Sequence, residues 1–245
     1  ISLYETMVLS RTFEEAILRE YHADKGPGFD IGKGLVPGEM HLSAGQEPVA
    51  FESDCREGIC GACGITVDGQ VHGPEDNLPA CHQRLVGLND GATIHLEPLR
   101  SACFPVVRDL IVDRSGLDEL IRAGGYVSIS AGTAPDADAL PITEQVAETA
   151  LDFAACIGCG ACVAACPNGS AHLFAGAKLA HLSMLPIPAD EREQRARSMI
   201  RVTDEIFGPC SYYGECARAC PAKVPLAAVA AVNHERMLAG LRRKL

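Results

Sequence analysis

The sequence predicts an α+β chain in which a small β-rich domain precedes a helical domain. Short apolar runs bounded by turn residues lie between residues 49 and 102, as is typical of strands. Windows rich in Ala and Leu dominate after about residue 104 and favour helices. In addition, eleven of the twelve cysteines fall into three tight groups, two of them in the helical part.

The start of the chain predicts one helix followed by a loop. Ser2 and Glu5 have the spacing of a capping box, and apolar residues recur at helical intervals up to residue 22. The five glycines and two prolines from Gly26 to Gly38 indicate a loop. The first residues are neither basic nor a long apolar run, so no signal peptide is expected.

The β-rich segment is expected to contain a hairpin over residues 65–72, because Asp68-Gly69 forms a tight turn between two short apolar runs. A further strand is expected over residues 93–96, with the domain ending near Pro98. The helical character of the rest starts in the mixed apolar pattern of residues 106–123, and a linker rich in Gly and Pro follows over 124–141. Further helices are expected near residues 142–155, 172–184, 189–206 and 223–243.

Composition excludes some classes of partner. The formal net charge of −11 argues against nucleic acid, because phosphate binding needs a basic surface. No uninterrupted apolar stretch reaches about 18 residues, so the sequence predicts no transmembrane segment of its own. Clustered cysteines in a chain of this size indicate metal binding under reducing conditions rather than a disulfide framework.

The first cysteine group predicts a [2Fe–2S] cluster. Cys55, Cys60 and Cys63 have the spacing C-x4-C-x2-C, and Cys81 follows, which is the plant-type arrangement. Intervening glycines allow a loop to wrap with its amides pointing inward. A zinc site is the alternative, although zinc ribbons usually pair two C-x2-C motifs and only one is present here.

The second and third groups predict two crossed clusters. Cys156, Cys159, Cys162 and Cys166 form a bacterial ferredoxin run followed by Pro167. In two-cluster proteins the fourth cysteine of such a run ligates the other cluster. The third group fits the same template, with Tyr213 at the second position. Its cysteines are Cys210, Cys216 and Cys220, and Pro221 follows them.

Crossing the fourth ligands gives one four-thiolate set and one three-thiolate set. The predicted [4Fe–4S] ligands are Cys156, Cys159, Cys162 and Cys220, and the predicted [3Fe–4S] ligands are Cys166, Cys210 and Cys216. A [4Fe–4S] cluster completed by Tyr213 or water is the alternative for the second set. The remaining cysteine, Cys103, stands in apolar company and is assigned no ligand role.

These motifs carry a resemblance to a known family. Residues 51–61, 104–110, 156–162 and 210–221 resemble the iron–sulfur subunit of succinate dehydrogenase and fumarate reductase, in its non-classical actinobacterial-type branch, and the resemblance covers about residues 46–245. It implies a β-grasp domain of the plant-type ferredoxin kind over 46–102, followed by an all-helical two-cluster ferredoxin domain over 103–245. The subunit is itself non-catalytic.

The resemblance also implies partners and a location. Electrons would pass from an FAD-containing flavoprotein subunit, through the three clusters, to a quinone at a membrane-anchor subunit, on the cytoplasmic side of a bacterial inner membrane. Pro167, Asn168 and Ser211 match family segments near the quinone, whereas Ala171 stands near the position of a tryptophan that many members have.

The first 45 residues follow another pattern. Residues 4–11 and 37–47 resemble the start of the alpha subunit of thiamine-diphosphate-dependent 2-oxo-acid dehydrogenases. The Gly-Asp-Gly motif by which that family binds its diphosphate does not occur here, so the resemblance implies no such activity, and His41 is expected to be a loop residue. If this segment replaces the usual leading strands, the β-grasp is incomplete.

Two other functions compete with this interpretation. One is a stand-alone redox or cluster-sensing protein without a flavoprotein partner. The other is a redox subunit of another flavin dehydrogenase, for example one that oxidises a 2-hydroxy acid. Co-purification with an FAD protein separates the first alternative from the family function.

Overall fold

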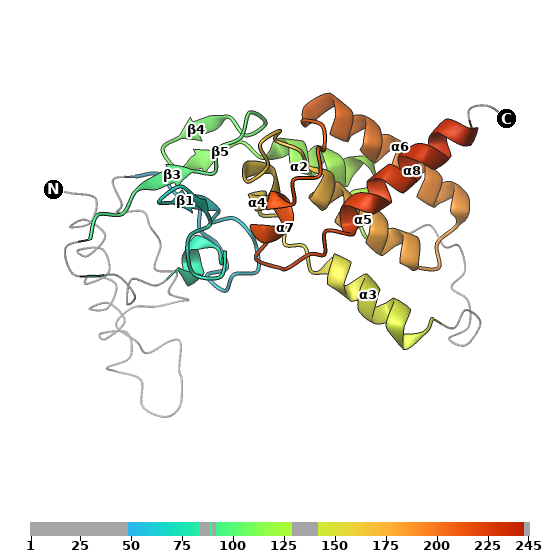
Figure 1. Ribbon diagram of the computed structural model, residues 1–245, viewed down its shortest axis with the longest axis horizontal. Coiled ribbons are helices and arrows are strands. Elements are labelled where there is room, and N and C mark those ends of the chain that lie inside the picture. The colour runs from blue at the N-terminus through green and yellow to red at the C-terminus, as the bar shows by residue number, and fades with distance from the viewer. Residues whose placement is uncertain (1–48, 84–88, 90–91, 129–141, 243–245) are drawn as a thin grey trace, which may run out of the picture. The chain divides into compact units, whose positions relative to one another are not determined.

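The computed structural model describes residues 49–83, 89, 92–128 and 142–242 (Figure 1). The helix and loop expected over residues 2–38, and most of the linker expected over 124–141, lie outside these residues. Contacts between Cα atoms divide the chain into one unit of residues 1–53 and another of residues 54–245. All the elements below belong to the second unit.

A three-stranded antiparallel sheet in the order β2-β1-β3 follows the first cysteine group. It consists of β1 (Ile65–Val67), β2 (Gln70–Val71) and β3 (Leu96–Pro98). The expected hairpin is confirmed, and Asp68 and Gly69 turn the chain at φ values of 48° and 78°. The strand expected over residues 93–96 was wrong in position. Strand β3 instead starts at Leu96, which pairs with Val67 at the end of β1, and runs to Pro98, which pairs with Ile65.

A second, two-stranded sheet lies where the sequence predicted helix. It pairs β4 (Val106–Arg108) with β5 (Ile111–Val112), and Asp109 turns between them at φ 48°. The expectation of an all-helical region from residue 103 was therefore wrong for residues 106–112. The valines and isoleucine here prefer extended backbone, which outweighs the weak helical spacing of this segment.

Helices make up the rest of the described chain. They are α2 (Ser115–Leu120), α3 (Glu144–Ala154), α4 (Ala161–Ala164), α5 (His172–Met184), α6 (Ala189–Ile206), α7 (Glu215–Arg218) and α8 (Ala228–Arg242). A π-helical turn, η3 (Ile121–Gly125), continues α2. The expected bounds of α5 and α6 are confirmed, whereas α8 begins five residues later than expected, because the turn at Lys223 (φ 53°) and Pro225 precede it.

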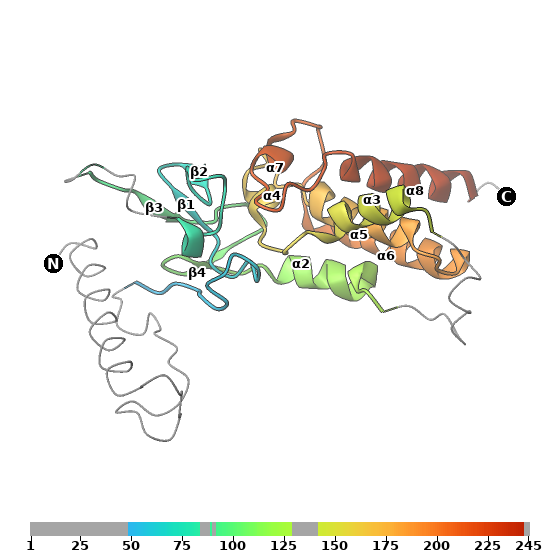
Figure 2. The ribbon, with the colours of Figure 1, turned by 90° about the horizontal axis from the view of Figure 1, so that it is seen from below.

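Helix α5 is the centre of the helical part. It packs against α3, α6 and α8, and residues are buried all around it (Figures 1 and 2). Gly176 makes the approach to α8 possible, since a Cβ there would stand 2.0 Å from the carbonyl oxygen of Ala228. The short helices α4 and α7 contact each other and lie between the strands and the long helices (Figures 1 and 2).

No helix within the described residues is both long enough and apolar enough to cross a membrane.

Candidate metal centres

The first cysteine group lies on a loop that aims its amides at sulfur. The backbone N–H groups of Glu57, Ile59 and Cys60 donate to Cys55 Sγ at 3.3–3.4 Å. These bonds, led by the one from Glu57, lower the pKa of the Cys55 thiol to about 7. Gly58, at φ 71°, gives the loop a left-handed turn that favours glycine. The loop thus stabilises a thiolate before any metal arrives.

The thiols of the other cysteines in this group lie close to one another and to Cys55. Cys81 lies on a short 3-10 helix, η1 (Ala80–His82), whose first amide donates to the Cys63 carbonyl at 3.3 Å. Burial raises the pKa of Cys63 to about 11, and the nearby thiols of Cys81 and Cys60 also raise it. The structure therefore brings together all four residues that the sequence assigned to the [2Fe–2S] site.

A cavity of about 340 Å³, including its open mouth, holds the four-thiolate set. Its lining contains Cys156, Cys159, Cys162 and Cys220. Burial, together with the thiols of Cys156 and Cys220, raises the pKa of Cys159 to about 12, and burial raises that of Cys162 well above its usual range. Cys220 comes from the third cysteine group, so residues of two groups line this cavity.

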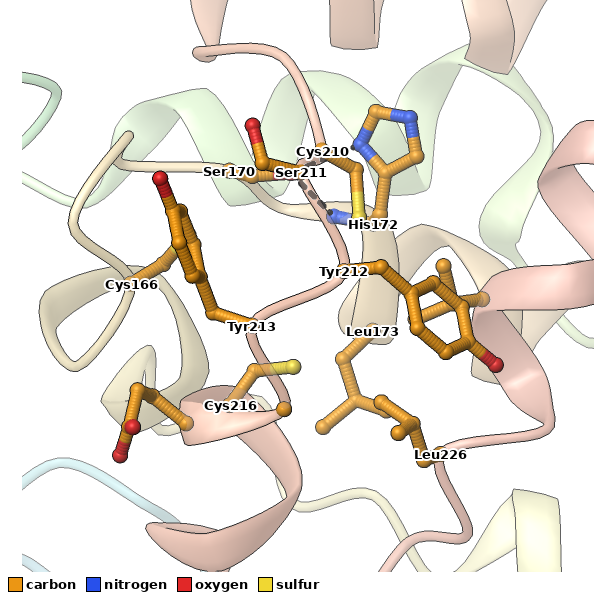
Figure 3. Close-up of a pocket in the computed structure, with 13 residues that line it drawn as sticks. Cys166, Ser170, His172, Leu173, Cys210, Ser211, Tyr212, Tyr213, Cys216 and Leu226 are labelled. Atoms are coloured by element: carbon orange, nitrogen blue, oxygen red, sulfur yellow. Dashed lines mark hydrogen bonds between the residues drawn. The ribbon is translucent and has the colours of Figure 1, made fainter.

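A second cavity of about 330 Å³, including its open mouth, holds the three-thiolate set (Figure 3). Cys166, Cys210 and Cys216 approach it from different sides. Burial raises the pKa of Cys216, and the thiols of Cys166 and Cys210 raise it further. Tyr213, at the second position of the template, also lines this cavity, although more than half of it is exposed.

The two cavities are built by a structural repeat. Helices α4 and α7 each have four residues and begin after a left-handed glycine, Gly160 at φ 84° and Gly214 at φ 83°. The same backbone hydrogen bonds recur: Cys166 N–H donates to Val163, and Cys220 N–H donates to Ala217. Because Tyr213 stands in the repeat where Cys159 stands in the first run, only three thiols reach the second cavity.

The donor sets fit iron–sulfur clusters. In the described part of the chain, no three His, Cys, Asp or Glu residues converge as a single metal ion requires. The thiols of the second and third groups instead surround cavities, which suit a cluster. Buried thiolates need a cation to offset their charge, and iron would supply it. All twelve cysteines are free of disulfides.

Cys103 lies apart from both cavity linings. Its Sγ donates to the carbonyl oxygen of Gly169 at 3.5 Å, and its N–H donates to Ser101 Oγ at 3.3 Å. This half-buried thiol packs against the hydrophobic core.

Sequence reasoning missed three polar residues near the centres. Arg114 reaches backbone carbonyls of both cluster-binding regions, and His72 is fully buried without a hydrogen-bond partner for either ring nitrogen. His172 lines the second cavity and shares a 2.8 Å hydrogen bond between its Nδ1 and Ser170 Oγ. No local motif marks Arg114 or His72, since the acceptors of Arg114 are distant backbone atoms and His72 is buried without a hydrogen-bond partner.

The fold and the cysteine sets define an iron–sulfur protein with one two-iron domain and one two-cluster domain. The 2Fe-2S iron-sulfur cluster binding domain family matches residues 15–119, and the 4Fe-4S dicluster domain family matches residues 155–224. The first match begins upstream of residue 46, where the sequence resemblance began. The expected iron–sulfur character is thereby confirmed.

Two relatives show which protein family the chain belongs to. It is 29% identical to the succinate dehydrogenase iron-sulfur subunit of Bacillus subtilis, covering 80% of this chain and 75% of that one. It is 31% identical to the fumarate reductase iron-sulfur subunit of Escherichia coli, covering 74% and 71%. The chain therefore belongs to the family of succinate dehydrogenase and fumarate reductase iron–sulfur subunits, and it is an electron-transfer subunit.

A solved structure shares the fold. The structure described as the Mycobacterium smegmatis Sdh1 complex in the apo form contains a chain that matches with a TM-score of 0.60 and 21% identity. The match covers 82% of this chain and 81% of that one.

Proposed function

We propose that this chain carries electrons between an FAD-containing flavoprotein subunit and a quinone, in a succinate dehydrogenase or fumarate reductase complex. The observation that carries the proposal is the crossing of the cysteine runs. Cys220 lines the cavity of the second group, and Cys166 lines the cavity of the third. Crossed ligation is the arrangement of two-cluster ferredoxins, which pass single electrons between neighbouring clusters.

The proposed ligand sets follow the cavities and the amide-lined loop. The [2Fe–2S] cluster is held by Cys55, Cys60, Cys63 and Cys81. The [4Fe–4S] cluster is held by Cys156, Cys159, Cys162 and Cys220, and the [3Fe–4S] cluster by Cys166, Cys210 and Cys216. Each cluster supplies one-electron chemistry when bound. The chain's own residues orient the thiolates, donate amide hydrogen bonds to them and exclude water from the buried ones.

The quinone end is proposed to lie beside the three-thiolate cavity. Ser211 lines this cavity, and Asn168 Nδ2 donates to Ser211 Oγ at 2.8 Å and to the Pro209 carbonyl at 2.9 Å. This hydrogen bonding holds the segment after the second cysteine run against the third. The resemblance assigned the same two residues, with Pro167, to the quinone side.

The partners are proposed to be a flavoprotein and one or more membrane-anchor subunits. The chain would then bind peripherally at the cytoplasmic side of a bacterial inner membrane. Cys60 and Ile59 are exposed on the [2Fe–2S] loop, with Ile59 63% exposed, which suits a docking face for the electron donor or acceptor. The same exposure favours the alternative of a cluster-sensing protein, since exposed cluster cysteines react readily.

Low-temperature EPR of the anaerobically purified chain tests the cluster proposal. We expect an oxidised [3Fe–4S] signal, and on stepwise reduction the signals of a [2Fe–2S] and a [4Fe–4S] cluster. Purification from membranes tests the partners: an FAD protein and membrane subunits should co-purify. A chain that holds all three clusters yet is recovered alone would favour the sensing alternative.

The resemblance of residues 1–45 to a thiamine-diphosphate enzyme stays a prediction. These residues lie outside the described part of the chain. Deleting them tests whether they belong to the two-iron domain. Retention of the [2Fe–2S] signal supports a foreign segment, whereas loss of that signal alone supports a segment that completes the domain.

A further inference from the structure

Arg114 joins two cluster-binding loops. It stands at the N-terminus of α2, directly after the second sheet. Its Nη1 donates to the carbonyl oxygens of Gly61 at 2.7 Å and Cys159 at 2.9 Å, and its Nη2 donates to the Ala62 carbonyl at 3.1 Å. Gly61 and Ala62 lie between two proposed [2Fe–2S] ligands, whereas Cys159 is a proposed [4Fe–4S] ligand.

The two loops meet there without side chains between them. A Cβ on Gly61 would stand 2.8 Å from the Ile157 carbonyl oxygen and 2.9 Å from the Cα of Cys159. The Arg114 stem also approaches the residue after Cys159, since its Cδ lies 3.4 Å from the position of a Cβ on Gly160. Carbonyl groups that converge in this way need a donor, and the planar guanidinium satisfies three of them at once.

Arg114 also places a permanent positive charge at this contact. His72 interacts with it but adds no charge at neutral pH, because burial, and then the charge of Arg114, lowers the pKa of His72 to about 4. The carboxylate of the neighbouring Asp113 is exposed and accepts a 2.8 Å hydrogen bond from the Ser115 amide.

We propose that Arg114 is a positioning residue for electron transfer between the two-iron and four-iron centres. It fixes the contact between the Gly61 loop and the Cys159 loop, and its charge favours an added electron on either side of that contact. The inference deepens the proposed function and rests on it. Net charge and hydrogen bonding near a cluster are established determinants of its reduction potential.

The test compares three variants of the full chain with its clusters. Arg114→Gln removes the charge. Arg114→Lys keeps the charge but loses the planar guanidinium and its multiple N–H donors. Arg122→Gln is the control, because Arg122 is an exposed arginine further along the same segment, paired with Glu119. The readouts are the [2Fe–2S] reduction potential, from an EPR-monitored titration, and the broadening of the [2Fe–2S] signal when the four-iron centre is also reduced.

Arg114→Gln should disfavour reduction of the [2Fe–2S] cluster about tenfold, which is a potential about 59 mV lower for one electron, and should weaken the broadening. Arg114→Lys should restore the potential while the broadening stays weaker than in the wild type. Arg122→Gln should change neither readout.

Wild-type potential and broadening in Arg114→Gln would overturn the inference. If Arg114→Gln loses a cluster, the Arg114→Lys variant tests the inference instead. Broadening equal to that of the wild type would then overturn the inference. Weaker broadening at an unchanged potential would support it. A wild-type chain without [2Fe–2S] and [4Fe–4S] signals would instead overturn the proposed function, and this inference with it.

Discussion

Gly61 and Cys159 touch backbone against backbone, since a Cβ on Gly61 would stand 2.9 Å from both the Cα and the amide nitrogen of Cys159. Gly61 belongs to the first cysteine group and Cys159 to the second. The loops around two proposed centres therefore share a contact that leaves no room for a side chain. This contact links the β-rich and helical parts at the point where an electron would pass.

Gly61→Ala should break that contact. The new methyl group would clash with the backbone of Ile157 and Cys159, and Gly61 also lies at φ 71°. We expect a loss of roughly 3 kcal/mol from overpacking and backbone strain together. The melting temperature of the full chain measures this loss. Gly69→Ala is the matched control, because Gly69 has φ 78° but nothing within 4 Å of a Cβ, so strain alone should cost roughly 1 kcal/mol.

Cys220→Ala and Cys166→Ala test the crossing. Cys220→Ala should remove the [4Fe–4S] signal and leave the [3Fe–4S] signal, because Cys220 lines the four-thiolate cavity. Cys166→Ala should do the reverse. EPR of both variants checks the pattern, with Cys103→Ala as a cysteine control that should keep every signal. The opposite pattern would show that each run ligates its own cluster.

Tyr213→Cys should convert the three-iron centre into a four-iron one. Tyr213 lines the second cavity at the repeat position of Cys159, so a thiol there would supply the missing corner ligand. The oxidised [3Fe–4S] EPR signal should disappear while the bound iron increases. Tyr212→Cys is the control, since Tyr212 lines the same cavity one position away. A persistent three-iron signal in Tyr213→Cys would show that the position cannot reach the corner.

His72 should make the chain less stable in mild acid. Burial lowers its pKa to about 4, whereas an unfolded histidine titrates near 6.5. The unfolded chain therefore binds the extra proton between these values, and stability falls by up to about 3 kcal/mol as pH drops from about 6.5 toward 4.

Thermal melts of the wild type and His72→Gln across pH 5–7.5 check this prediction. The variant should show a shallower dependence, although not a flat one, because burial also lowers the pKa values of His172 and His181. His95→Gln, at an exposed histidine, should leave the slope unchanged. An equal slope in His72→Gln and the wild type would contradict the assignment.

The cysteine spacing predicted which thiols gather, because most cysteines of each proposed site are close in sequence. Cys156, Cys159 and Cys162 fall on one short turn and helix, so their convergence is a local property of the chain. Even the distant partner Cys220 could be predicted, because the second run repeats the template. Helices α5 and α6 were also predictable from the local sequence. Strong helix formers fill both segments, and Pro188 directly precedes α6.

Other features depend on tertiary contacts that the sequence does not display. The pairing of β4 with β5 needs only a few β-branched residues and a turn at Asp109, a signal too short to separate from a helix start. The role of Arg114 was not predictable, since its acceptors are carbonyl groups some fifty residues away. The buried position of His72 likewise follows from packing rather than from any motif.

The repeat that ends at Cys166 and Cys220 has a consequence for how the protein matures. In the proposed ligation, the last cysteine of each run binds the cluster of the other run, so neither run completes its own centre alone. A growing chain that has emerged only as far as Cys166 offers three thiols to the first cavity and one to the second. The proposed ligation therefore makes complete insertion of both inorganic cores a late event, which follows the synthesis of the chain through Cys220.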